Sequence, residues 1–158
     1  MSHHRLFRPL IVAGLAALTI TGLAEAIVGP EYHFAIFGVV NGIQVARLNV
    51  VLQPPPDDSL PCPVTLAFID SRGRLLGGPD TFPVRGGEAV HTDFSGDSNS
   101  RVGDRLPIRA TVMIQDPENF PGCAGKTALA SVEVIDRLTR ATHVILTNPV
   151  KVEPPAGR

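Results

Sequence analysis

The sequence predicts an all-β fold. After residue 26, the chain contains runs rich in Val, Ile, Leu, Phe and Thr in which apolar and polar residues alternate, as they do in half-buried strands. Turn residues separate the runs, and the 158 residues include 15 glycines and 15 prolines. No amphipathic helical period is visible beside them. We therefore expect about seven or eight antiparallel strands packed as an immunoglobulin-like β-sandwich, with a small β-barrel as the alternative.

The first 26 residues predict a secretory signal peptide. Arg5 and Arg8 form a basic start, an uncharged apolar run covers residues 10–23, and residues 24–26 (Ala-Glu-Ala) make a small-x-small cleavage site. We expect cleavage after Ala26. An uncleaved membrane anchor is the alternative, because the apolar run approaches the length of a bilayer span.

The rest of the chain divides into a β-sandwich domain at residues 27–150 and a flexible, proline-containing C-terminal tail at residues 151–158. Once the signal peptide is removed, we expect the chain to be exported to the periplasm or the extracellular space. No membrane contact is expected of it there.

The first strand candidates lie before residue 70. Residues 32–40 form the first, which ends at an Asn-Gly turn, and residues 43–52 form the second. Three prolines at positions 54–56 end the second strand, because proline has no amide hydrogen for a β-ladder. Residues 62–69 form the third. The positions expected to face the core are Ala46, Leu48, Val50 and Leu52, followed by Cys62, Val64, Leu66 and Phe68.

The later candidates are residues 81–84, 89–94, 108–115, 128–135 and 142–147. Pro83 predicts that the strand at 81–84 lies at a sheet edge. The strand at 108–115 alternates most clearly, and it should turn one face to the core (Ile108, Ala110, Val112, Ile114) and the other to solvent (Arg109, Thr111). Residues 142–147 allow two interpretations, an edge that could pair with a partner strand or a buried strand.

Two segments share one turn pattern. In residues 66–74 and 132–140, a strand ends at an Asp, and an Arg follows four residues after that Asp. The Asp side chain can accept hydrogen bonds from the backbone of the turn that follows it. Internal duplication and convergence on the same turn chemistry both explain the likeness.

The only two cysteines, Cys62 and Cys123, remain after signal cleavage and predict one disulfide. An even number of cysteines in an exported chain favours pairing, because the oxidising compartment lets the bond form and persist. Two separate buried thiols are the alternative. A structural zinc site is not expected, since two distant cysteines lack the short ligand spacing of such sites.

The charge balance disfavours nucleic acid and anionic lipid as partners. Fourteen basic and fifteen acidic residues give a formal net charge of −1, so the whole chain has no excess that would hold phosphate groups. Catalytic motifs are also missing from the sequence: it contains no Gly-x-Ser-x-Gly element. We expect a protein that is not an enzyme, with no catalytic residue and no cofactor.

One loop carries a weak metal-binding pattern. Asp93, Asp97 and Asp104 provide oxygen donors in a polar segment, and oxygen donors are the ligands that calcium prefers. The segment lacks the glycine and glutamate positions of an EF-hand loop. A solvated connection rich in Asp, Asn and Ser turns explains the same residues, and this is what we expect.

The runs RLNVV at residues 47–51 and CPVTLAFID at residues 62–70, with a proline-rich loop between them, resemble small exported bacterial β-sandwich proteins of unknown function. The resemblance implies export and a sandwich fold, and it assigns no site. Function is therefore expected to be that of an exported, non-catalytic binding or structural module whose partner is a protein. A small calcium-binding or hydrolytic extracytoplasmic domain is the alternative.

Overall fold

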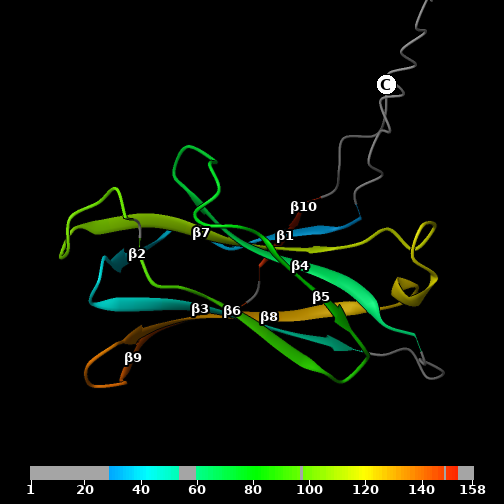
Figure 1. Ribbon diagram of the computed structural model, residues 1–158. Helices are drawn as coiled ribbons and strands as arrows, with labels where there is room; N and C mark the ends of the chain where they lie inside the picture. Colours follow the sequence, from blue (N-terminus) through cyan, green and yellow to red (C-terminus); the bar gives the residue numbers. More distant parts are fainter. Residues whose placement is uncertain (1–28, 54–59, 97, 148, 153–158) are drawn as a thin grey trace, which may run out of the picture.

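The structure is a computed structural model that describes residues 29–53, 60–96, 98–147 and 149–152. The predicted signal peptide lies outside these residues. The described chain forms two antiparallel sheets that face each other as two layers (Figure 1), and neither sheet closes on itself. The predicted β-sandwich is confirmed, and the small barrel is excluded.

The first sheet contains six strands, and the second contains four. Five strands of the first sheet lie in the order β10 (Val150–Val152), β1 (Glu31–His33), β7 (Arg105–Ile114), β4 (Cys62–Asp70), β5 (Asp80–Val84), and β2 (Phe37–Val40) pairs with the other half of β7. The second sheet has the order β6 (Ala89–Phe94), β3 (Gln44–Gln53), β8 (Thr127–Asp136), β9 (Thr142–Thr147).

The described residues thus contain ten strands where the sequence predicted seven or eight. One reason is that the run 32–40 divides into β1 and β2. Tyr32 pairs with Val112, whereas Phe37 pairs with Ile108, so the segment between β1 and β2 contains one residue more than the facing part of β7. This extra residue interrupts the ladder as a β-bulge does.

A second reason is β10, which pairs with β1 at the edge of the first sheet. It includes Lys151 and Val152, which the sequence assigned to a flexible tail beginning at residue 151. Residues 153–158 of that tail lie outside the described residues.

The core forms between the inner faces of the two sheets. The predicted inward positions of β3 and β4 are buried, and the four inward positions of β7 are at most 2% exposed. From β8, Val132 and Val134 complete this layer. Burial of each large aliphatic side chain contributes roughly 1.5–3 kcal/mol, so the alternating pattern supplies the main driving force for the fold.

The outer face of β7 is not solvated at its centre, so the prediction for Thr111 is wrong. Thr111 is 8% exposed, and Ala67 beside it on β4 is equally buried. β7 has neighbours on both sides here, since Thr111 also pairs with His33 of β1. Small side chains in a central strand are shielded by the larger residues around them, and alternation alone does not reveal this.

The prediction that Pro83 lies in an edge strand is confirmed, because β5 is at the edge of the first sheet. The edge interpretation of residues 142–147 also holds for the described strands. There β9 pairs with β8 alone, and Val144 is 38% exposed.

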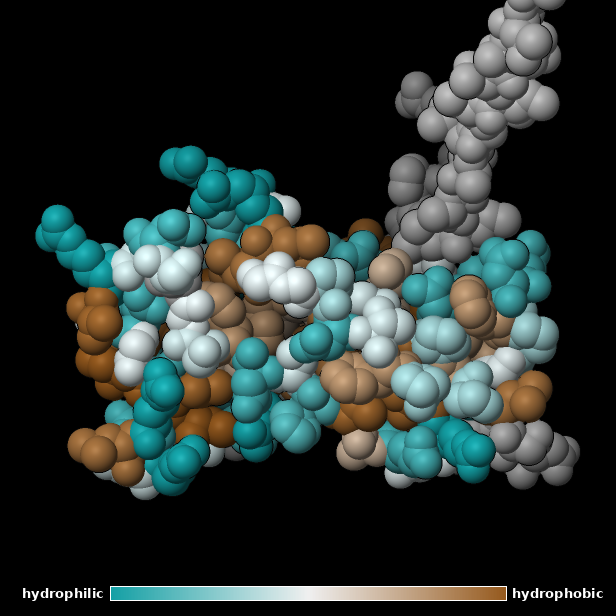
Figure 2. Space-filling view, in the orientation of Figure 1, coloured by the Kyte–Doolittle hydropathy of each residue, from teal (hydrophilic) through white to brown (hydrophobic). Residues whose placement is uncertain are grey.

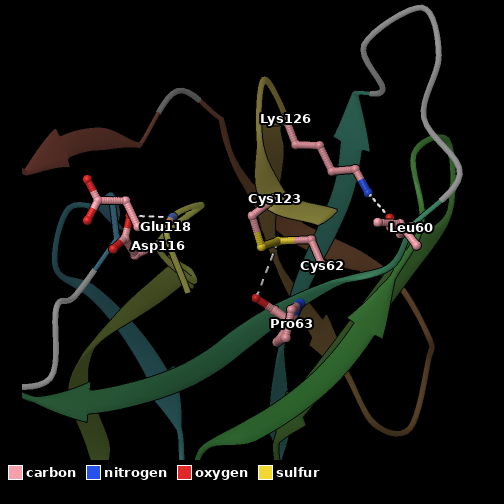
Figure 3. The surroundings of a disulfide bond; sticks show 7 residues. All are labelled: Leu60, Cys62, Pro63, Asp116, Glu118, Cys123 and Lys126. Carbon is pink, nitrogen blue, oxygen red and sulfur yellow. Dashed lines mark hydrogen bonds between the residues drawn. A yellow bond between two sulfur atoms is a disulfide. The ribbon is translucent and has the colours of Figure 1, made fainter. Parts of the chain in front are cut away.

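The Cys62–Cys123 disulfide is present, with 4.7 Å between the two Cα atoms (Figure 3). Cys62 begins β4, and Cys123 ends the short 3₁₀ helix η1 (Pro121–Cys123) in the crossover from β7 to β8. The bond therefore fastens this crossover to the end of the first sheet, and it does not join two strands of opposite sheets. Close by, the ammonium group of Lys126 donates a hydrogen bond to the carbonyl of Leu60.

Reduction of this disulfide should destabilise the domain strongly. Releasing a closed loop of about 62 residues gives the unfolded chain entropy equivalent to about 4 kcal/mol. We expect the melting temperature to fall by on the order of 10–20 °C in reductant, and the Cys62→Ala/Cys123→Ala variant to melt at the lowered temperature without reductant. A fall of less than about 3 °C would contradict this account.

Substitutions on β7 and β8 should separate buried from exposed positions. Val112→Asp places an unpaired charge in the core and should cost about 3–5 kcal/mol, enough to unfold the domain. Thr111→Asp should also cost more than about 1 kcal/mol, whereas Thr127→Asp at an exposed position of β8 should stay within about 0.5 kcal/mol. Urea unfolding monitored by circular dichroism measures all three. Equal stability of the Thr111 and Thr127 variants would show that the outer face of β7 is solvated.

Candidate binding surface at one end of the sandwich

Four connections lie toward the same end of the sandwich; in Figure 1, three of them are at the left and the β4–β5 connection rises at the top, above β7. They are the β2–β3 turn (residues 41–43), the β4–β5 connection (71–79), the β6–β7 loop (95–104) and the β8–β9 turn (137–141). We call the described residues of these connections, together with Asp70, Arg105 and Asp136 at the adjoining strand ends, the loop end.

Backbone hydrogen bonds hold three of these connections together. The amide of Arg137 in the β8–β9 turn donates to the carbonyl of Ile43 at 2.9 Å. The amide of Gly103 in the β6–β7 loop donates to the carbonyl of Asn41, also at 2.9 Å. The β2–β3 turn is therefore the point at which the two longer connections are joined.

Asn41 organises the β6–β7 loop from a buried position. The residue is only 5% exposed. Its Nδ2 atom donates hydrogen bonds to the carbonyls of Ser100 at 2.9 Å and Arg101 at 3.1 Å. Gly96 has φ = +135°, and a Cβ atom there would lie 2.1 Å from Asn41 Oδ1. The sequence identified an Asn-Gly turn here but not the role of the Asn side chain, because its partners lie about 60 residues away.

Asp70 closes the turn that follows β4. Its Oδ1 atom accepts hydrogen bonds from the amides of Arg72 at 2.8 Å and Arg74 at 2.9 Å, and its Oδ2 atom accepts from Nε of Arg74 at 2.7 Å. The amide of Arg74, followed by its side chain and the amide of Arg72, holds the pKa of the Asp70 carboxyl below its ordinary value.

Asp136 likewise closes the turn that follows β8. Its Oδ1 atom accepts from the amides of Leu138 at 2.9 Å and Thr139 at 2.7 Å, and from the Thr139 hydroxyl. The bonds from Thr139 are the main reason that the pKa of Asp136 lies below its ordinary value. The shared sequence pattern thus reflects shared turn chemistry. The arginines differ, however, because Arg140 has a positive φ of 63° and its amide bonds to the carbonyl of Asp136.

Arginine side chains are concentrated at the loop end. All are exposed, and together they number six: Arg72, Arg74, Arg101, Arg105, Arg137 and Arg140. Arg74 is paired with Asp70. Asp70 and Asp136 are bonded to their own turns, and Asp104 accepts the amide of Arg101 at 3.0 Å. The described aspartates thus accept hydrogen bonds from the backbone of their own loops. The guanidinium group of Arg105 lies against Gly38 of β2, whereas Arg72, Arg101, Arg137 and Arg140 are exposed and their guanidinium groups bond to no side chain among the described residues.

Large aliphatic side chains are exposed in the same connections. Leu138 is 91% exposed, Val102 78%, Leu75 55% and Ile43 44%. Leu138 follows Arg137, Val102 follows Arg101, and Leu75 follows Arg74. Because exposed aliphatic groups recur beside basic groups here, the loop end is a candidate interaction surface.

Three shallow hollows adjoin the loop end: two lie between β4 and β6, and the third lies between the β4–β5 connection and the start of β7. Their volumes are about 420, 300 and 280 Å³, and Leu76 lines all three. The rings of Phe68 and Phe94 pack beneath them with centroids 5.8 Å apart. Figure 2 shows hydrophobic surface at the base of a hollow between the two layers. Asp70 and Arg74 line the largest hollow, so hydrophobic and charged groups meet there.

The three aspartates of the weak metal pattern do not form a visible ligand set. Asp93 receives two hydrogen bonds from Arg47, each 2.8 Å long, and this interaction lowers the pKa of Asp93. Asp104 accepts the amide of Arg101, and Asp97 lies outside the described residues. Within the described ranges, no group of three or more His, Cys, Asp or Glu side chains could hold a metal ion together.

Comparisons with known proteins do not assign a family. No protein-family model matches the chain. No curated protein matches it either. Among solved structures, a crystal structure of Thermotoga maritima 1070 is similar with 8% sequence identity and a TM-score of 0.45, and the match covers 78% of this chain and 93% of that chain. Likeness at this level carries no argument about function. In the described part of the chain, no helix has the length and apolar character needed to cross a membrane.

The aspartate turns should make stability depend on acidic pH. Because the folded state lowers the pKa of Asp70 and Asp136, their ionised forms stabilise the protein fully above the ordinary carboxyl pKa of about 3.9, and this contribution is lost as pH falls through the lower folded values. Asp70→Asn and Asp136→Asn should therefore lose less stability than the wild type between about pH 5 and pH 2. Urea unfolding across this range measures the slopes. Parallel curves for all three proteins would contradict the assignment.

Calcium should not stabilise the native state. Asp93 is already neutralised by Arg47, so recruiting it to a cation would require breaking two charge-assisted hydrogen bonds. We expect no change in melting temperature when calcium is raised to millimolar concentration. A calcium-dependent rise that disappears in Asp97→Asn would instead establish a metal site, since binding to the native state alone raises its stability.

Proposed function

We propose that this chain is an exported, non-catalytic binding module that contacts its partner through the loop end. The observation that supports the proposal is that exposed arginines and exposed aliphatic residues project from the same connections, whereas the described aspartates there are bonded to the backbone. Loops at the end of a rigid sandwich can present such groups without disturbing the core.

The side-chain chemistry supports binding over catalysis. A nucleophile needs a base within hydrogen-bond reach and a third group that orients the base. Around the hollows, Asp70 is bonded to Arg74, Asp80 accepts the hydroxyl of Thr92, and Asp93 is bonded to Arg47. These carboxylates stabilise turns and strand pairs.

Export is supported by the disulfide and by the sequence of residues 1–26. A disulfide persists in oxidising compartments and is rare in the cytosol. Expression with the native N-terminus, followed by mass spectrometry of the chain outside the cytoplasm, tests the proposal. The expected product begins at Ile27 and retains the disulfide. A chain found only in the cytoplasm would contradict it.

Site-specific photo-cross-linking tests the use of the loop end. A photoreactive phenylalanine analogue is placed at Val102 or Leu138 and, as the matched control, at Phe120, which is 41% exposed near the disulfide at the opposite end. We expect adducts from Val102 and Leu138 and none from Phe120. Adducts from Phe120 alone, or equally from all three positions, would show that the loop end is not the binding surface.

A further inference from the structure

We propose that the partner of the loop end is the surface of a membrane that contains anionic lipid. This inference rests on the proposed function, because it names the partner of the same surface. It departs from the expectation, drawn from net charge, that the exported chain makes no membrane contact. Two properties of the loop end carry it: where its aliphatic groups lie and where its charges lie.

The aliphatic groups project from the ends of separate loops. Figure 1 shows the β6–β7 and β8–β9 connections extending beyond the strands that they join. Val102 and Leu138, 78% and 91% exposed, lie in these two connections, and the β2–β3 turn with Ile43 joins them by hydrogen bonds. Side chains so placed can enter the boundary between lipid headgroups and acyl chains, where their apolar surface leaves water.

Basic residues lie beside the aliphatic groups that would insert. Arg101, Arg137 and Arg74 each directly precede an exposed aliphatic residue in the chain. A guanidinium group binds phosphate through paired hydrogen bonds, and a long side chain can hold its charge at the headgroups while its methylene groups lie in apolar surroundings. With the loop end facing the membrane, the aliphatic groups enter the lipid and the neighbouring arginines bind lipid phosphates.

The charge distribution predicts which end of the molecule faces the membrane. The described loop end has six arginines against three aspartates, and Asp97 in the same loop lies outside the described residues. At the opposite end, the described parts of the β5–β6 turn and the β7–β8 crossover carry two basic residues against three acidic ones: Arg85, Lys126, Glu88, Asp116 and Glu118. An anionic surface would attract the loop end and repel the opposite end.

An acidic protein is the competing partner, and the aliphatic groups favour lipid over it. A protein partner would need a separate pocket for each projecting side chain, whereas a fluid lipid surface accommodates several without such matching. Val102, Leu138 and Ile43 line none of the three hollows around Leu76.

Vesicle sedimentation with the exported chain tests the proposal. The probes are vesicles of phosphatidylcholine alone and of phosphatidylcholine with about 30 mol % phosphatidylglycerol, and a soluble poly-glutamate serves as the acidic polypeptide. The loop-end variants are Arg137→Gln/Arg140→Gln and Val102→Ser/Leu138→Ser. The matched controls at the opposite end are Arg85→Gln and Phe120→Ser. Circular dichroism melting shows that each variant is folded.

We expect binding to the anionic vesicles that weakens in high salt and is much weaker with phosphatidylcholine alone. The double arginine variant should bind on the order of 30-fold more weakly, since each basic group near an anionic surface contributes about 1 kcal/mol. The double aliphatic variant should also bind more weakly, and the two controls should bind as the wild type does.

Three results would overturn the lipid assignment. Equal binding to both kinds of vesicle would indicate insertion of another segment, such as an uncleaved N-terminal apolar run. Equal loss in the control variants would place the contact elsewhere. Binding to poly-glutamate but not to vesicles would assign an acidic protein as the partner and leave the proposed function intact, whereas the proposed function itself fails if cross-linking does not distinguish the loop end from Phe120.

Discussion

The burial of one face of each sheet is the constraint on which the rest of the structure depends. β3 and β7 alternate so regularly that a shift of one residue would expose aliphatic groups and bury Arg47 or Arg109. Their register places the ends of the strands, and the strand ends determine where the connections lie. The loop end is therefore a consequence of core packing, although none of its exposed aliphatic residues belongs to the core.

Carboxylates within the turns shape the chemistry of this end. Asp70, Asp104 and Asp136 each accept hydrogen bonds from backbone amides of their own turns. A carboxylate used in this way stabilises the loop and presents less of its charge to an outside ligand. Within the described residues, the guanidinium groups of five of the six arginines form no hydrogen bond or ion pair with a side chain, so their charge remains available at the surface. Turn stability and surface charge are thus linked through the same short segments.

The opposite end is fastened differently. Cys62 and Cys123 join the start of β4 to the crossover between the sheets, and Gly122 lies so close to Pro61 that a Cβ atom would be 2.3 Å from the Pro61 carbonyl oxygen. This close approach requires glycine. The covalent bond and the tight packing hold the crossover that contains Pro117 and Pro121, and they leave the loop end free of covalent restraint.

The sequence by itself determined the strands from β3 to β9, the edge position of Pro83, the disulfide and the two aspartate turns. These features depend on local alternation, on proline lacking an amide hydrogen, on an even cysteine count, and on side chains that reach their own backbone. Three features depend on residues far away in the chain and could not be predicted from a local pattern. They are the bulge between β1 and β2, the burial of Thr111 and the contacts of Asn41. Only the tertiary structure assembled the six arginines: net charge averages over the whole chain, whereas the fold brings basic residues from three separate connections to one end and turns the nearby aspartates toward the backbone.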